Sequence, residues 1–326
     1  IPGTVAGLVY ALEKYGTMSL KEVIKPSLRL AKKGFPISHD LSRILRKYED
    51  RLKRNPSSKR IFYKNDDFYK PGDILKQKDL AWSLNQIKKK GASAFYEGKI
   101  AEKLVKDIRE NGGIITLGDL KNYKVQETLA ISGSYQDFQI MSMPPPSSGG
   151  VHIVQMLNIL EELEISNYPY GSADYLHLLS ETMRLAYADR SEYLGDPAFY
   201  EVPIEGLTSK EYATTLAHKI KIDTVNNSTE IKPGKPFDYE SPETTHYSVA
   251  DQYGNVVSNT YTLNFSFGTG IVAKGTGILL NNEMGDFSAK PGTPNAYGLI
   301  GGKANSIEAG KRPLSSMTPT IILKNN

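Results

Sequence analysis

Thr244 has the most unusual position among the residues that could do chemistry. It stands where a stretch rich in Asn, Pro, Gly, Ser and charge, residues 222–243, meets the strand-like run Thr245 to Ala250. A threonine hydroxyl is a potential nucleophile when a base lies beside it. Threonine is also a common first residue of a strand, so the position alone leaves both interpretations open.

Other common catalytic and cofactor sites are missing from the sequence. The chain has no cysteine, which excludes disulfides, cysteine zinc sites and a cysteine nucleophile. None of its five histidines pairs at i, i+4, and there is no HExxH, so we predict neither a metal nor a cofactor. A GxxxxGK[ST] phosphate loop, a GxGxxG motif and a GxSxG elbow are also absent. We interpret Gly268-Thr269-Gly270 as a turn.

The composition is that of a globular protein, with 39% hydrophobic and 23% charged residues in 326. Apolar runs such as 151–160 are shorter than the ~18 residues that indicate a membrane span. Residues 1–130 carry 27 basic and 15 acidic side chains, about +12, and the rest carries −8. A solvated lysine-rich surface explains this better than a nucleic-acid partner. The basic run Arg51 to Arg60 contains Pro56 and no aromatic residue, and we expect a loop there.

Helices are expected in most of the first part of the chain. Ser19 and Glu22 make a capping box, Pro26 predicts a break, and Gly34 predicts a helix end. Apolar spacing predicts further helices, including one that ends at Gly112-Gly113. These helices cover residues 40–54, about 100–111, 151–164, 172–190 and 208–220.

Strands are expected mainly after residue 243. A hairpin is predicted earlier, over 129–141, with its turn at Ser132-Gly133-Ser134. The later strands cover residues 245–250, 256–263, 276–281 and 318–323. This order of helices and strands predicts a mixed fold built from packed layers.

Eight segments, in order along the whole chain, resemble one family. They are PGTVAGL at 2–8, GGIIT at 112–116 with DLKNY at 119–123, PPPSSGG at 144–150, ADRSEYLGDP at 188–197, ESPETTHYSVAD at 240–251, YTLNFSFGTGI at 261–271, LLNNEMGDFSAKPGTPNAYGL at 279–299 and KRPLSSMTPTI at 311–321. The family is that of the gamma-glutamyltransferases, also called gamma-glutamyl transpeptidases or glutathione hydrolases.

The resemblance implies an α+β fold, the four-layer αββα sandwich of N-terminal-nucleophile hydrolases. It also implies a precursor that cuts itself between Glu243 and Thr244. Residues 1–243 would then be the C-terminal part of a large subunit, and 244–326 the start of a small one. On this alignment the sequence is truncated at both ends, and the family suggests a periplasmic or secreted protein.

The implied reaction is acyl transfer from γ-glutamyl amides such as glutathione. The Thr244 hydroxyl would attack the amide, and water or an amino acid or dipeptide acceptor would release the acyl group. The cut frees an α-amine with a pKa near ~8, which could serve as the base.

The family also implies roles for the residues around the substrate. Glu283 and Asp286, with Asn264, would bind its α-ammonium group, and Ser315 and Ser316 its α-carboxylate. Such remote contacts orient the scissile carbonyl.

Two further residues have implied roles near the nucleophile. Thr262 would steady Thr244, and Tyr297 would lie in a lid over the pocket. Turn, strand or packing roles remain open for several of these side chains. Arg190 and Asp196 are interpreted as structural ion-pair partners.

The sequence departs from the family pattern at Gly285, where an aspartate is usual. A carboxylate-binding arginine and the Ser-Pro-Gly-Gly oxyanion hole fall outside residues 1–326. A missing oxyanion donor typically costs ~10²–10³ in rate, so the predicted activity is that of the parent protein. Two alternatives remain: a related acylase or poly-γ-glutamate-processing enzyme, and a catalytically inactive homologue.

Overall fold

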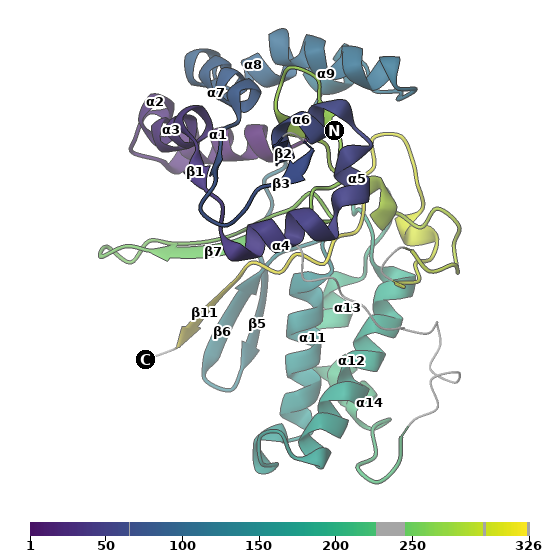
Figure 1. Ribbon diagram of the computed structural model, residues 1–326. Helices are drawn as coiled ribbons and strands as arrows, with labels where there is room; N and C mark the ends of the chain where they lie inside the picture. The colour runs from purple at the N-terminus through teal and green to yellow at the C-terminus, as the bar shows by residue number, and fades with distance from the viewer. Residues whose placement is uncertain (65, 226–244, 296–297, 325–326) are drawn as a thin grey trace. The chain divides into compact units, whose positions relative to one another are not determined.

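The computed structural model describes residues 1–64, 66–225, 245–295 and 298–324. It divides into two compact units, one of residues 1–127 with 263–282 and one of 128–262 with 283–326 (Figure 1). The units therefore do not follow the predicted subunit boundary at 243/244. That boundary lies outside the described residues and stays a prediction.

The first unit is mainly helical and has short two-stranded pairings. Its helices are α1 (Thr4–Tyr15), α2 (Leu20–Val23), α3 (Lys25–Lys33), α4 (His39–Lys47), α5 (Glu49–Lys53), α6 (Pro56–Phe62), α7 (Lys78–Lys90), α8 (Ser93–Tyr96), α9 (Lys99–Glu110) and α10 (Leu117–Lys121). Its strands pair antiparallel: β1 (Phe35–Pro36) with β4 (Ile74–Leu75), β2 (Tyr63–Lys64) with β3 (Asp67–Phe68), and β9 (Val272–Ala273) with β10 (Ile278–Leu279).

The second unit combines a helical cluster with two antiparallel sheets. Its helices are α11 (Gly149–Glu162), α12 (Ala173–Tyr193), α13 (Ile204–Thr208) and α14 (Lys210–Ala217), with 3₁₀ turns η1 (Ile165–Asn167), η2 (Glu283–Asp286) and η3 (Lys303–Asn305). One sheet has the order β11 (Thr320–Lys324), β6 (Phe138–Ser142), β5 (Ile131–Tyr135), and the other pairs β7 (Thr245–Ala250) with β8 (Val256–Tyr261). The teal helices α11, α12 and α14 pack together around a core that includes Ile159, Leu178 and Leu216 (Figure 1).

The first predicted helix signals are confirmed. The Ser19 backbone N–H donates to Glu22 Oε2 at 2.9 Å and completes the capping box. The helix breaks as Pro26 predicts, because α2 ends at Val23 and Pro26 stands in the first turn of α3. Gly34 follows α3 with φ = 88°, which glycine adopts without strain.

The loop predicted over Arg51 to Arg60 is wrong, because helices α5 and α6 cover most of it. Asn55 is the N-cap of α6, and its Oδ1 accepts a hydrogen bond from the Ser58 N–H at 2.9 Å. Pro56 opens the helix, a position where its missing N–H leaves no hydrogen bond unmade. The same Asn-Pro pair that suggests a loop is therefore a helix start.

The predicted hairpin forms, but its turn is displaced. Tyr135 pairs with Phe138, so the turn lies at Gln136 and Asp137 instead of at 132–134. Gly133 lies inside β5, where a Cβ would come within 2.6 Å of Val154 Cγ1 on α11. The glycine allows the helix to approach the strand and does not mark the turn.

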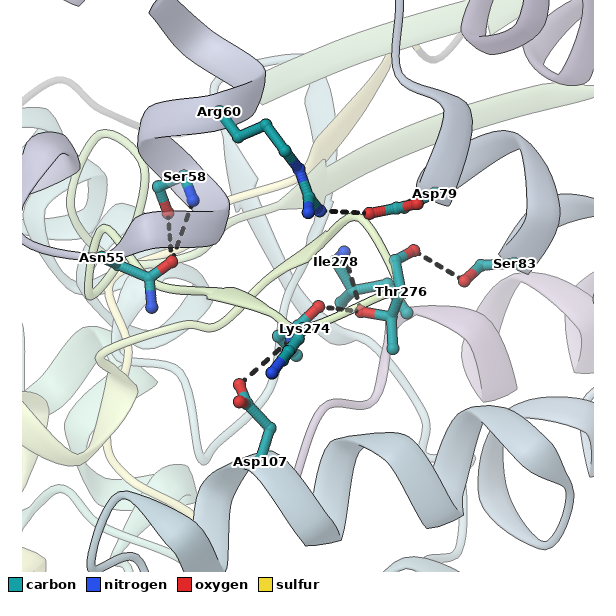
Figure 2. A network of polar contacts seen from close by, with 10 residues as sticks. Asn55, Ser58, Arg60, Asp79, Ser83, Asp107, Lys274, Thr276 and Ile278 are labelled. Atoms are coloured by element: carbon teal, nitrogen blue, oxygen red, sulfur yellow. Dashed lines mark hydrogen bonds and ion pairs between the residues drawn. The ribbon is translucent and has the colours of Figure 1, made fainter.

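Residues 263–282 are held in the first unit by hydrogen bonds to its helices (Figure 2). The Ser58 hydroxyl donates to the Gly270 carbonyl at 2.6 Å and accepts from the Val272 N–H at 2.9 Å. Ser83 Oγ donates to the Thr276 carbonyl at 2.7 Å, and Asp107 accepts from the Lys274 N–H at 3.1 Å. This segment is an integral part of the unit.

The turn predicted at Gly268-Thr269-Gly270 is confirmed. Both glycines have positive φ, 54° and 77°. Phe267 joins the core of the unit beside them.

Within the described ranges, no helix has the length and apolar character needed to cross a bilayer.

Candidate active site

Two predicted site residues lie outside the described residues, and so does the predicted cleavage site. These are Thr244, Tyr297 and the Glu243–Thr244 bond. Their roles stay predictions. The structure does describe the remaining predicted residues: Thr262, Glu283, Asp286, Ser315 and Ser316 in the second unit, and Asn264 in the first.

Thr262 lies next to the strand that follows the predicted nucleophile. Strands β7 and β8 pair with Thr245 opposite Tyr261, and Thr262 is the next residue after Tyr261. Thr262 is thus at the end of the hairpin where the chain enters β7, and it is half-buried. This register places Thr262 next to the residue that pairs with Thr245, and its predicted role beside Thr244 stays a prediction.

Ser315 and Ser316 lie against the PPPSSGG segment. The Ser315 N–H donates to the Pro146 carbonyl at 2.9 Å, and the Ser148 N–H donates to the Ser315 carbonyl at the same distance. Side chains join the same contact, because Ser315 Oγ donates to Ser147 Oγ at 3.0 Å. Two backbones about 170 residues apart in sequence are thereby fixed to each other.

Glycines in PPPSSGG make this close contact possible. A Cβ on Gly149 would lie 2.3 Å from Thr318 Oγ1 and 2.6 Å from the Met317 carbonyl. A Cβ on Gly150 would lie 2.2 Å from the Met143 carbonyl. The first turn of α11 can approach residues 317–318 because Gly149 has no side chain, and it can approach Met143 because Gly150 has none.

Glu283 and Asp286 begin and end the 3₁₀ turn η2. The pKa of Glu283 is raised to about 8, mainly by burial and also by the charge of Asp286 and a hydrogen bond with its side chain. The two carboxyls therefore favour sharing a proton until a cation approaches them. Gly285, where the sequence departs from the family pattern, is exposed within the same turn.

Asn305 joins the acidic turn to the segment that leads to the serines. Its Nδ2 donates to the Asp286 carbonyl at 2.7 Å, and its Oδ1 accepts from the Leu314 N–H at 2.9 Å. Leu314 directly precedes Ser315. A single buried amide side chain thus spans the segments that carry the two predicted groups of substrate ligands. No motif in the sequence pointed to Asn305.

Asn264 is in the first unit, where it is buried with φ = 73°. Its Nδ2 donates to the Asn282 carbonyl at 3.3 Å, and Asn282 Oδ1 accepts from the Phe265 N–H at 3.0 Å. The Asn264 side chain therefore helps to hold residues 264–265 against Asn282. Its predicted role beside Glu283 and Asp286 stays a prediction.

Arg190 contacts the predicted carboxylate site, whereas the sequence suggested only a structural ion pair for it. It is buried on α12, its Nε donates to Ser148 Oγ at 3.2 Å, and its Nη2 donates to Ser316 Oγ at 3.3 Å. Asp196 accepts from the Arg312 N–H at 2.9 Å and so holds the segment that precedes the serines. The available sequence signal was an arginine in the ADRSEYLGDP segment, at the end of the helix predicted over residues 172–190.

The comparisons with known proteins agree on one family. A family model described as Gamma-glutamyltranspeptidase matches residues 1–326. The glutathione hydrolase proenzyme of Escherichia coli (strain K12) is 53% identical over 324 residues, which cover 99% of this chain and 56% of that protein. The chain thus spans a little over half the length of this relative.

Solved structures also resemble the chain. The Helicobacter pylori gamma-glutamyltranspeptidase matches with a TM-score of 0.70 and 44% identity over 74% of this chain and 70% of that one. A cephalosporin acylase from Bacillus halodurans matches with a TM-score of 0.85 and 25% identity over 100% and 57%. The predicted α+β class is confirmed by these matches and by the mixed helices and strands. On this evidence, the chain belongs to the gamma-glutamyltranspeptidase family.

Proposed function

We propose that the protein to which this chain belongs is a gamma-glutamyltransferase that cleaves γ-glutamyl amides such as glutathione. One observation in the second unit carries the proposal. Asn305 joins an acidic turn, suited to an ammonium group, to a serine segment anchored by Arg190, suited to a carboxylate. A γ-glutamyl donor carries both groups on its α-carbon, remote from the scissile amide.

The proposed reaction begins when the precursor is cut between Glu243 and Thr244. The Thr244 hydroxyl then attacks the γ-carbonyl of the donor, and its proton passes by way of the freed α-amine to the departing amine. Water hydrolyses the resulting ester, or an amino acid or dipeptide takes the acyl group. Holding the α-carbon groups fixes the carbonyl near the hydroxyl, which is how remote binding energy accelerates the reaction.

The experiment that tests this proposal uses the full-length protein and a Thr244→Ala variant. Intact mass and N-terminal sequencing should give two chains for the wild type, the smaller beginning Thr244-Thr245-His246, and one chain for the variant. The wild type should turn over a chromogenic γ-glutamyl anilide. Thr224→Ala, which removes an exposed threonine upstream of the cut, is the matched control and should be processed normally. An uncut wild type would support the inactive-homologue alternative.

An acylase activity is the second candidate, because a cephalosporin acylase shares the fold over this whole chain. A glutaryl amide has the donor's carboxylate but no α-ammonium group, so Glu283 and Asp286 would contribute nothing favourable to its binding. We expect kcat/KM for the γ-glutamyl anilide to exceed that for the glutaryl anilide. A higher kcat/KM for the glutaryl anilide would favour the acylase hypothesis.

The proposed location is the periplasm or the outside of the cell. The support for it is the family relationship alone. Fractionation of cells that express the full-length gene, followed by the anilide assay on each fraction, tests this location. Activity confined to the cytoplasmic fraction would contradict it.

A further inference from the structure

We propose that Arg190 is a positioning residue that directs the Ser316 hydroxyl at the α-carboxylate of the donor, while Ser315 serves to hold the segment. This inference rests on the proposed function and assigns Arg190 a part in it. Arg190 is 5% exposed, and a guanidinium group stays charged at all relevant pH values. Burying such a charge is costly unless it is hydrogen-bonded, and two of the hydrogen bonds that Arg190 makes go to the predicted carboxylate site.

The guanidinium bridges two segments through their hydroxyl oxygens. Nε donates to Ser148 of PPPSSGG, and Nη2 donates to Ser316 of the 311–321 segment. An N–H can only donate, so both serine oxygens act as acceptors toward Arg190. Each serine must therefore direct its own O–H away from the guanidinium.

The other hydroxyl protons of this cluster are used within the protein. Ser148 Oγ donates to the Ser315 carbonyl at 3.2 Å. Ser315 Oγ donates to Ser147 Oγ at 3.0 Å, and Ser147 Oγ donates to the Met317 carbonyl at 2.7 Å. The hydroxyl of Ser315 is thus committed to holding the two segments together.

Ser316 differs from these three serines. Among the described residues of this cluster, it is the exposed one, and its oxygen is already held by Arg190. Its O–H is therefore directed outward, where a ligand oxygen can accept it. Hydrogen bonds that are linked in a chain polarise one another, so the guanidinium makes the Ser316 hydroxyl a stronger donor. It also places a positive charge one hydroxyl group away from the bound carboxylate.

The test compares two anilide donors that differ only in the α-carboxylate: γ-glutamyl-p-nitroanilide and 4-aminobutanoyl-p-nitroanilide. Turnover of the first by the full-length wild type is measured beforehand, so that failure of the proposed function is seen separately. Arg190→Gln should raise KM for the γ-glutamyl anilide roughly 10- to 100-fold, with a smaller change in kcat. The KM of the analogue should change by less than about threefold, because it lacks the group that Ser316 binds.

Three further variants separate positioning from a purely structural role. Arg190→Lys keeps the cation and should recover part of the loss. Ser316→Ala should reproduce the donor selectivity of Arg190→Gln, and the double variant should be little worse than either single one, because both remove the same interaction. Ser315→Ala should affect the two donors equally.

Precursor processing and thermal melting of each variant report on folding. Equal losses with both donors in Arg190→Gln and Arg190→Lys would show that Arg190 only supports the fold. Additive effects of the Arg190 and Ser316 substitutions would overturn the proposal as well.

Discussion

Glu283 combines burial with a neighbouring carboxylate, and both raise its pKa, to about 8. A bound ammonium group favours the ionised carboxylate, so donor binding should strengthen as pH rises and Glu283 loses its proton. We therefore expect kcat/KM for a γ-glutamyl anilide to rise between about pH 6.5 and pH 8. The freed amine of Thr244, with a pKa near ~8, contributes to the same profile, so a variant is needed to isolate Glu283.

Glu283→Gln should weaken donor binding and make the pH dependence of kcat/KM shallower over that range. Glu308→Gln, which changes an exposed carboxyl of the same unit, should leave the profile as it is. Parallel profiles for wild type and Glu283→Gln would contradict the role of the acidic turn.

His152 is a second buried group that responds to pH. Burial is the main cause that lowers its pKa, to about 3, and the charge of Arg190 adds to the effect. The unfolded chain has a histidine pKa near ~6.5. Below that value the unfolded state takes up a proton that the folded state does not. The free energy of unfolding should then fall as pH drops, by at most about 1.4 kcal/mol per pH unit.

The ring centroid of His152 lies 4.9 Å from that of Tyr187, and His152→Gln removes the titration while keeping a polar side chain there. Denaturant unfolding at pH 7 and pH 4.5 should show a smaller loss of stability for the variant than for the wild type. His39→Gln, at an exposed histidine, should lose as much as the wild type. A full-sized loss in His152→Gln would show that other groups carry the pH dependence.

At the scale of elements, the start of α11 can pack against the 315–318 segment because Gly149 has no side chain. Gly149→Ala would place a Cβ 2.3 Å from Thr318 Oγ1, which we expect to cost about 1–3 kcal/mol of stability and to raise donor KM by displacing the serines. Gly206→Ala is the matched control, because a Cβ there meets nothing within 4 Å and lies in helix α13. It should be neutral or stabilise by up to about 1 kcal/mol. Equal effects of both changes would argue against the contact.

Local signals predicted several elements, and the errors have two causes: the Asn55-Pro56 helix start was interpreted as a loop, and contacts with distant residues left no local signal. The capping box and Gly34 could be recognised because their hydrogen bonds and backbone angles involve neighbours in sequence. Gly133 was wrongly predicted to lie in the hairpin turn. A glycine is needed there because Val154, on the separate element α11, leaves no room for a side chain. The contact of Arg190 with Ser316 joins residues 126 apart, so no local pattern could reveal it. The site serines and carboxylates were predicted through family resemblance, and their roles await experiment.

At the scale of the whole molecule, the first unit includes residues from beyond the proposed cut. We expect the two chains of the processed protein to stay together without a covalent link in native size-exclusion chromatography. Ser58→Ala would leave the Gly270 carbonyl and the Val272 N–H without their buried partner, at a cost of about 1–3 kcal/mol. It should therefore lower the denaturant concentration at which the chains separate.

Ser93→Ala, which removes an exposed hydroxyl of the same unit, controls for this change. It should leave the separation midpoint unchanged. Chains that part in native buffer would contradict the anchoring of residues 263–282.

The segment 263–282 also has a consequence for synthesis on the ribosome. Residues 1–127 emerge long before the strands that complete their core, and at ~5–20 residues per second the delay is roughly ten seconds or more. During that interval the N-terminal helices expose the surface that β9 and β10 later cover. A protein that cut itself as soon as Thr244 emerged would release this unit unfinished, so we expect the proposed self-cleavage to be slower than the arrival of residue 282.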